Sequence, residues 1–221
     1  MVRFKDVTRI YHRGDGVSVP ALNGVSLEIA QGDCVALTGP SGCGKSTLLN
    51  LLGGLDRPDS GEIWVGDTAL HRAGDKELTR YRRFEIGIVF QFFNLLPSMT
   101  VAENVELPLL LRGDSPRKAA ARVAEMLDLV GLGPRSGHFP HQLSGGEMQR
   151  TAIARGLSGE PKLLLADEPT GNLDSENASR VAETLLKIAS QKIVTLVIVT
   201  HSDDLARMAP RHLPMRDGQI A

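Results

Sequence analysis

The chain has 221 residues, a length that suits one domain with an added lobe or two small domains that share a core. Its 25 basic and 26 acidic residues nearly balance, which argues against a nucleic-acid-binding surface built by charge alone. Two cysteines do not suggest a disulfide framework, and no apolar run approaches the roughly 18 residues that a membrane span needs. The N-terminus also lacks the apolar core of a signal peptide. We therefore expect a cytoplasmic protein, or one held at a membrane only through a partner.

The first part of the chain predicts mainly strands. Apolar and charged residues alternate from Val2, and this first strand is expected to end at Tyr11, before a glycine-rich loop over 12–20. The patterns that follow predict strands over 24–29, 34–38, 62–65 and 86–90, a buried helix over 45–52 and a polar helix over 75–83.

From Phe92 onward the pattern predicts helices. Ser115 and Pro116 supply the N-cap and first turn of a helix whose apolar residues recur at helical spacing up to Val130. Another helix is expected over 144–158. We infer a helical lobe, residues 92–155, inserted into an α/β core. That core comprises 1–91 and 156–221, and its last part is expected to contain strands over 162–166 and 195–200 and helices over 175–189 and 203–208.

A glycine-rich stretch between the 34–38 strand and the next helix carries the strongest chemical signal. It consists of Gly39, Pro40, Ser41, Gly42, Cys43, Gly44, Lys45, Ser46 and Thr47. Glycines let several backbone N–H groups converge on one anion, and the start of a helix adds its own free N–H groups. Lys45 is unfavourable in a first helical turn by about 0.3–1 kcal/mol unless an anion lies there. The stretch predicts a nucleotide phosphate site, where Ser46 can ligate the accompanying Mg²⁺.

An apolar run that begins at Leu163 ends in two carboxylates, Asp167 and Glu168. Because alternate residues of a strand point to opposite faces, the two carboxylates should have different roles. One can hold Mg²⁺, directly or through water, and the other can accept a proton from attacking water. Solvated acids often end strands, so this pair is informative only together with the phosphate loop.

A second candidate anion site lies at the start of the 144–158 helix. Ser144 and Glu147 have the spacing of a capping box, which would simply begin the helix. The box does not account for Gly145 and Gly146, each of which weakens the first turn by about 0.5–1 kcal/mol relative to Ala. Bare backbone at a helix N-terminus suits an anion. Two such sites in one small domain suggest that the second serves a nucleotide held by another copy.

Together these residues resemble an ATP-binding-cassette (ABC) transporter ATPase over essentially the full chain. Residues 39–47 resemble the Walker A loop, 163–167 the Walker B strand followed by the general base Glu168, and 143–147 the family signature. The resemblance implies an α/β fold, in which a P-loop NTPase core carries an N-terminal antiparallel β subdomain and an inserted α-helical subdomain. It also implies ATP and Mg²⁺ as cofactors.

The resemblance assigns further residues. Tyr11 falls where the family stacks an aromatic ring on adenine, although an ordinary strand tyrosine is the alternative. Gln91 is similar to the Q-loop glutamine, Asp174 lies in a stretch similar to the D-loop, and His201 resembles the switch histidine at the γ-phosphate. The implied catalytic residues are Glu168, His201, Gln91 and Lys45; the implied nucleotide-binding residues are Tyr11, 39–47, Ser144, Gly145, Gly146 and Asp174; and the implied metal ligands are Ser46, Gln91 and Asp167.

The resemblance also implies partners. Two copies would close head to tail around two ATP molecules, and an integral membrane permease, rather than nucleic acid, would receive the motion. Short motifs such as those at 52–56 and 215–218 resemble lipoprotein-releasing and macrolide-exporter ATPases, and 107–110 favours the lipoprotein-releasing side. A non-transport ABC ATPase of the cell-division type is the alternative. The cargo and the direction of transport depend on the permease.

Two expectations concern individual side chains. Phe92, Phe93, Leu95 and Leu96 follow Gln91 in a loop, where they either contact the permease or pack inside the helical lobe. Cys43 lies within the phosphate loop, and we expect its alkylation to block activity and bound ATP to protect it.

Overall fold

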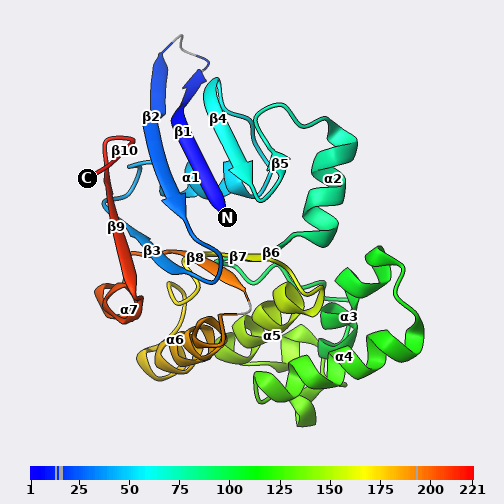
Figure 1. Cartoon of the computed structure of the whole chain (residues 1–221). Coiled ribbons are helices and arrows are strands. Elements are labelled where there is room, and N and C mark those ends of the chain that lie inside the picture. The colour runs from blue at the N-terminus through cyan, green and yellow to red at the C-terminus, as the bar shows by residue number, and fades with distance from the viewer. Residues whose placement is uncertain (13, 15–16, 193) are drawn as a thin grey trace.

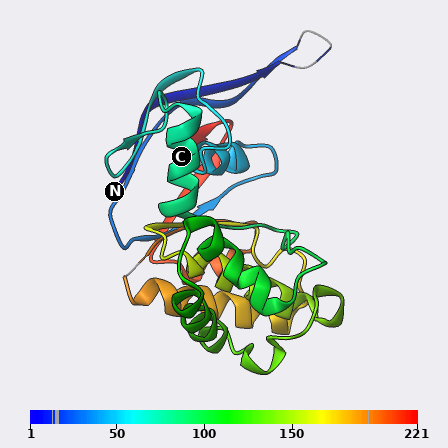
Figure 2. The same cartoon turned by 90° about the vertical axis from the view of Figure 1, so that its right-hand side faces the viewer.

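A computed structural model describes residues 1–221 except 13, 15–16 and 193. The elements form three layers, with an antiparallel sheet above, a mixed sheet in the middle and helices below (Figure 1). Turning the molecule keeps this order, with most of the helices on the far side of the mixed sheet from the antiparallel sheet (Figure 2). No helix among the described residues is long and apolar enough to cross a membrane.

The antiparallel sheet has the strand order β2-β1-β4-β5. Its strands are β1 (Val2–His12), β2 (Ser18–Ile29), β4 (Ser60–Val65) and β5 (Thr68–Ala69). β2 is longer than the predicted 24–29 strand, and Pro20 lies inside it opposite Ile10. An edge strand tolerates proline because one side of its ladder is unpaired. The predicted 12–20 loop is thus wrong at His12, which belongs to β1, and over 18–20, and residues 13, 15 and 16 lie outside the described part.

The mixed sheet has the order β10-β9-β3-β8-β7-β6. Its strands are β3 (Cys34–Thr38), β6 (Ile86–Val89), β7 (Leu163–Asp167), β8 (Thr195–Val199), β9 (Arg211–Arg216) and β10 (Gln219–Ile220). β3 lies between β8 and β9 and runs parallel to both, and β7 runs parallel to its two neighbours β6 and β8. The leucine run at 163–165 is therefore a buried strand, as predicted.

Helices cover both faces of the mixed sheet. α1 (Lys45–Leu52) and α2 (Asp75–Phe84) lie on the side of the antiparallel sheet. The other side carries α3 (Val101–Arg112), α4 (Pro116–Leu129), α5 (Gly145–Ser158) and α6 (Ser175–Ser190), with the short turns η1 (Gly133–Arg135) and η2 (Pro140–Gln142) between α4 and α5; α7 (Asp203–Met208) follows β8. Ser115 is the N-cap of α4 with proline next to it, as predicted, although its side chain makes no cap hydrogen bond.

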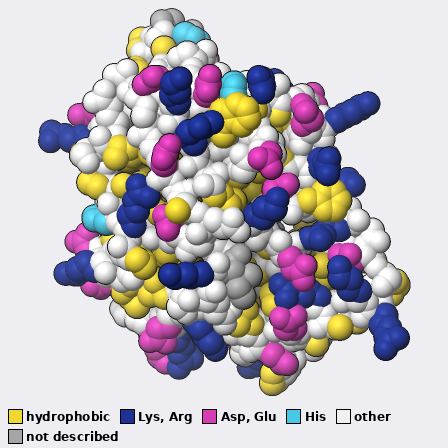
Figure 3. Space-filling view, viewed as in Figure 1, with side chains coloured by type: hydrophobic (Ala, Val, Ile, Leu, Met, Phe, Trp, Pro, Cys, Tyr) yellow, Lys and Arg dark blue, Asp and Glu magenta, His cyan; other side chains and the backbone are white. Residues whose placement is uncertain are grey.

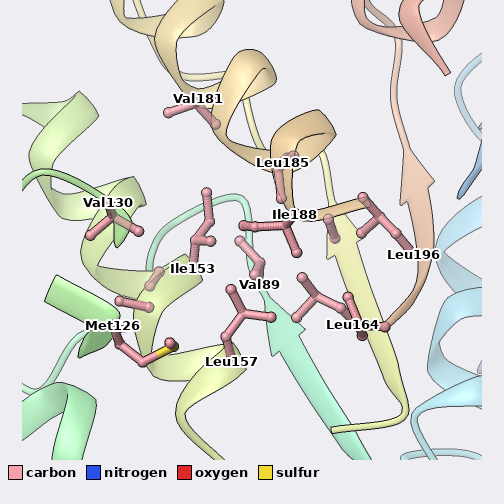
Figure 4. Close-up of a cluster of buried hydrophobic side chains, with 14 of the residues drawn as sticks. Val89, Met126, Val130, Ile153, Leu157, Leu164, Val181, Leu185, Ile188 and Leu196 are labelled. Atoms are coloured by element: carbon pink, nitrogen blue, oxygen red, sulfur yellow. The ribbon is translucent and has the colours of Figure 1, made fainter. Parts of the chain in front are cut away.

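Each face of the mixed sheet has its own hydrophobic core. One core joins α1 and the antiparallel sheet to side chains such as Leu37, Leu165 and Val197. The other joins the helices below to the opposite face of the same strands, as Leu164, Leu196 and the side chains of α5 and α6 show (Figure 4). Alternate strand residues enter different cores because successive side chains point to opposite faces.

Candidate active site

The carboxyl ends of neighbouring parallel strands carry the predicted site residues. β3 leads into the 39–47 loop, β7 ends at Asp167, β8 leads to His201 and β6 leads to Gln91. Ligands of α/β sheets bind at this edge of the strands. The fold therefore brings the phosphate loop, both carboxylates, the histidine and the glutamine, which are far apart in sequence, to one edge.

The glycines of the phosphate loop have conformations and neighbours that exclude a side chain. Gly44, the N-cap of α1, has φ 105°, and a Cβ there would lie 2.3 Å from the carbonyl oxygen of Ala21 in β2. Gly39 has φ 142°, and its Cβ would lie 2.1 Å from Met215 O. The loop is thus held closely between β2 and β9, and its backbone has the glycine-dependent geometry that a phosphate cradle needs.

Lys45 is buried in this loop, with 5 % of its surface exposed. Its Nζ donates to the carbonyl oxygens of Gly39 at 2.9 Å and Pro40 at 3.0 Å. The first turn of α1 contains no acidic residue that could balance the charge. Because a buried cation needs a partner, this arrangement suits an anion held against the loop.

Cys43 lies in the loop, and its side chain is buried. Its side chain is 5 % exposed and belongs to the core beneath the antiparallel sheet. Its Sγ lies 3.8 Å from Lys45 Nζ. Burial therefore limits the access of an alkylating reagent to Cys43 even without a nucleotide, while the expected block of activity by alkylation and its prevention by ATP stay predictions.

Asp167 is suited to a metal ion. Burial raises the pKa of its carboxyl, while the Ser46 hydroxyl and the charge of Lys45 act in the opposite direction without cancelling that effect. Its buried Oδ1 has no hydrogen-bond partner among the described residues. A carboxylate oxygen and a serine hydroxyl are ligands that Mg²⁺ accepts. The pair Ser46 and Asp167 thus fits the cation that accompanies a nucleotide.

Glu168 has a different orientation from Asp167. Its φ is 46°, a left-handed conformation that is unusual for glutamate, and its backbone N–H donates to Val199 O at 2.9 Å. Its Oε2 accepts a hydrogen bond of 3.0 Å from the backbone N–H of His201, and its Oε1 lies 3.3 Å from His201 Nε2 without hydrogen-bond geometry. The strained residue joins the ends of β7 and β8 and holds the two candidate catalytic side chains together.

Gln91 and the segment before α6 lie next to this pair. A Cβ on Gly171 would lie 3.4 Å from Gln91 Nε2 and 3.5 Å from Glu168 Cβ. Asp174 is the N-cap of α6, with Oδ1 accepting from Asn177 N–H at 3.0 Å and Oδ2 from Asn177 Nδ2 at 2.7 Å. In this chain Asp174 thus shapes the start of α6.

Ser144, Gly145 and Gly146 begin α5, on the opposite side of the mixed sheet from α1 (Figure 1). The predicted capping box is present, since Ser144 Oγ accepts from Glu147 N–H at 3.3 Å and Glu147 Oε2 accepts from Ser144 N–H at 2.8 Å. A Cβ on Gly146 would lie 2.1 Å from Asn177 Oδ1. Packing against Asn177 within the same chain therefore also requires glycine at position 146, which could not be predicted from the sequence. These residues do not join the phosphate loop of their own chain.

Tyr11 lies on β1 with 37 % of its surface exposed. Its hydroxyl donates to Asp56 Oδ2 at 2.7 Å, and the guanidinium carbon of Arg9 lies 4.8 Å from its ring centroid. Arg9 in turn forms salt bridges with Asp56 and Asp59, each at 2.9 Å. Sequence reasoning missed Arg9 and the role of Asp56. The ring is held at its hydroxyl end and on one face while part of its surface stays open.

Comparisons with known proteins agree with this geometry. The family described as ABC transporter matches residues 22–171. The chain belongs to the ABC transporter family. It is 48% identical to the lipoprotein-releasing system ATP-binding protein LolD of Geobacter metallireducens, with 100% of this chain and 97% of that protein aligned, and 45% identical to LolD of Alcanivorax borkumensis, with 100% and 96% aligned.

Solved structures of an ABC cassette confirm the predicted fold. The dimeric structure of the cassette MJ0796 from Methanocaldococcus jannaschii, in a post-hydrolysis state with ADP and Pi, has a TM-score of 0.91 and 42% identity, covering 100% of this chain and 96% of that one. The predicted α/β ABC ATPase fold, with an antiparallel β part and helices inserted between β6 and β7, is correct. α5 runs to Ser158, so the predicted lobe boundary at 155 falls within a helix.

Proposed function

We propose that this chain is the ATP-hydrolysing subunit of a lipoprotein-releasing ABC transporter. The observation that carries the proposal is full-length similarity to proteins named lipoprotein-releasing system ATP-binding protein, at 45–48% identity, combined with the site at the sheet edge. The cell-division alternative has no comparable support among these relatives.

Each group of site residues would have its own role in binding and hydrolysing ATP. The backbone of 39–47 and the Lys45 ammonium would bind the phosphates, and Tyr11 would stack on the base. Ser46 and Asp167, together with Gln91, would hold Mg²⁺, which neutralises developing charge on the phosphates. Glu168 would take the proton of the attacking water, and His201, held by Glu168 through its backbone N–H at 3.0 Å, would contact the γ-phosphate.

The active unit would be a dimer. Ser144, Gly145 and Gly146 lie across the mixed sheet from the phosphate loop of the same chain, so they can reach a nucleotide only if a second copy presents it. The relative solved with ADP and Pi is dimeric. Asp174, at the start of α6, would lie near the same contact between copies.

A permease would dock beside the loop that follows Gln91. Phe92 is 72 % exposed and Leu96 is 39 % exposed, whereas Phe93 and Leu95 pack against the helical core. Nearby elements α2, α3 and α5 also line an open groove, whose residues include Arg82, Ile88, Leu107, Pro108, Leu111 and Gly156. Exposed apolar side chains of this kind favour a protein partner.

Binding to a permease would place the chain at the inner face of the cell membrane, as a peripheral subunit with core segments 1–91 and 156–221 and a helical lobe 92–155. On the face shown in Figure 3, Lys and Arg side chains are intermingled with Asp and Glu. This mixture suits a protein partner better than a nucleic acid.

A pull-down tests the proposal. Glu168→Gln protein with ATP is used to capture partners from detergent-solubilised membranes, and the same protein without ATP is the control. An integral membrane permease enriched only with ATP supports the proposal. Capture of a divisome component, or of no membrane protein, would overturn the transport role but leave the ATPase chemistry standing.

A further inference from the structure

Side chains from two other segments, α5 and the turn before α6, donate hydrogen bonds to the loop after β6. Asn172 Nδ2 donates to the Gln91 carbonyl oxygen at 3.1 Å. Arg155, on α5, donates through its two terminal nitrogens to Asn94 O at 2.5 Å and Phe93 O at 2.8 Å. Every acceptor is a backbone carbonyl, so the donors fix the path of the loop whatever its side chains are.

The path they fix is one that the loop does not adopt by preference. Phe93 has φ 62° and Asn94 has φ 50°, two successive residues in the left-handed region. Such conformations are unfavourable for residues other than glycine and persist where surrounding contacts impose them. The Arg155 guanidinium binds the carbonyls of these same two residues. A third donor, Gln149 of α5, which is 0 % exposed, reaches the carbonyl oxygen of Phe90 at 3.5 Å.

The loop in turn determines where the Gln91 side chain lies. Its amide nitrogen is next to Gly171, whose Cβ position is 3.4 Å from Gln91 Nε2 and 3.5 Å from Glu168 Cβ. Gly171 N–H donates to Glu168 O at 3.1 Å. Asn172 therefore joins Gln91 to the same turn that carries Glu168.

We propose that Asn172 and Arg155 are positioning residues that hold the Gln91 loop beside Glu168. Through them two segments jointly set the place of the Gln91 amide: residues 172–174, the stretch similar to the D-loop, and α5, the helix that begins in the family signature. A shift of α5 or of the turn before α6, the two elements expected to meet a second copy, displaces the Gln91 loop directly. The inference rests on the proposed ATPase function for its kinetic consequence, but not for its structural one.

The structural consequence is measured without nucleotide. Hydrogen exchange is followed in peptides covering 88–97 in Asn172→Asp, Asn172→Ala and Arg155→Lys, with Arg117→Lys on the exposed side of α4 as the matched control. Asp keeps the shape of Asn but loses the donor, and Lys keeps the charge of Arg but cannot bind two carbonyls in a fixed fork. We expect exchange in this segment to rise about tenfold in the three variants, with β7 and α6 unchanged. Wild-type exchange in the segment would overturn the proposal.

The kinetic consequence is measured in double-mutant cycles, in which kcat and KM for ATP are compared for each variant with and without Gln91→Ala. We expect Asn172→Asp and Arg155→Lys to lower kcat about tenfold while KM for ATP stays within about twofold, because a misplaced side chain affects chemistry more than binding. In the Gln91→Ala background the same changes should alter kcat by less than about twofold, since the residue they position is gone. Effects that multiply with Gln91→Ala would show that the residues act elsewhere. A wild-type chain without ATPase activity would instead refute the proposed function, and the exchange result would still decide the loop contacts.

Discussion

The His201 backbone donates a hydrogen bond to the Glu168 carboxylate, and the His201 imidazole lies beside the same carboxylate. The His201 N–H donates to Glu168 Oε2 at 3.0 Å, and the imidazole Nε2 lies 3.3 Å from Oε1. The glutamate side chain is 13% exposed and the histidine side chain 50%. The buried carboxylate thus stays fixed while the imidazole can turn toward a ligand without losing the backbone contact.

Glu168→Gln keeps an acceptor for the His201 N–H but cannot take a proton. We expect its ATP hydrolysis to fall by about 10²–10⁴-fold, with ATP affinity changed little. His201→Ala should also retain ATP affinity, because it leaves Glu168 and the phosphate loop in place. Phosphate release and equilibrium ATP binding check both variants. Weakened ATP binding in Glu168→Gln would show that this carboxylate maintains the structure of the site and does not act mainly in the chemical step.

Asp167→Asn should separate stability from metal binding. Burial raises the pKa of Asp167, so holding the carboxylate ionised above that pKa destabilises the fold, and removing the charge should stabilise it at neutral pH. We expect the Tm without Mg²⁺ to rise by about 2–4 °C for each kcal/mol gained, and the stabilisation of wild type by Mg²⁺-ATP to be lost. The advantage of Asn should shrink as the pH falls and wild-type Asp167 becomes protonated. A variant less stable than wild type at pH 7 would contradict this interpretation.

Asp56→Asn tests the contact that holds Tyr11. Burial by itself raises the pKa of Asp56, but hydrogen bonds from Tyr11 and the Arg57 backbone, with the charge of Arg9, outweigh it, so the pKa lies below its usual value. A lowered pKa contributes stability above the unfolded pKa, and that stability is lost as the pH falls through the folded pKa.

We therefore expect Asp56→Asn to be less stable than wild type in urea at pH 7. The difference should begin to shrink near roughly pH 4, the ordinary Asp pKa, and vanish only below the lower pKa of the folded state. Tyr11→Phe removes only the hydroxyl that donates to Asp56 at 2.7 Å and should show part of the same pH dependence. A stability difference that stays constant with pH would assign the effect to packing instead of charge.

Sequence patterns predicted the parallel strands and the phosphate loop because those depend on local chemistry. Gly39, Lys45 and Asp167 carry their signals within a few residues of chain, and the strand and helix around them follow from short apolar runs. β2 was underestimated because Pro20 normally interrupts strands, and only its edge position permits it. β9 and β10 were missed because β9 owes its place to pairing with β3 rather than to its own composition.

The hydrogen bonds that hold the Gln91 loop in place could not be predicted in the same way. Asn172 lies 81 positions from Gln91 in the chain, and Arg155 lies 62 positions from Phe93, so nothing local links the donors to their acceptors. The burial of Cys43 was not predicted, because the side of the loop that a residue faces depends on backbone dihedral angles that glycine leaves open. Long-range contacts and loop direction are the parts that needed the structure.

Gly146→Ala tests whether the signature glycine is needed inside one chain. Its added Cβ would lie 2.1 Å from Asn177 Oδ1 and 2.8 Å from Asn177 Cβ, a distance that real contacts essentially never show. We expect α5 and α6 to be forced apart, with a loss of about 1–3 kcal/mol in the free energy of unfolding, as for other overpacked sites.

The double variant Gly146→Ala/Asn177→Ala removes the amide but keeps the Asn177 Cβ, so its stability should recover in part beyond the sum of the single effects. Urea unfolding of the four proteins gives the coupling free energy. If Gly146→Ala is as stable as wild type yet cannot hydrolyse ATP, the glycine serves only the second copy's nucleotide. Losses that simply add would show that Asn177 is not the group the new methyl meets.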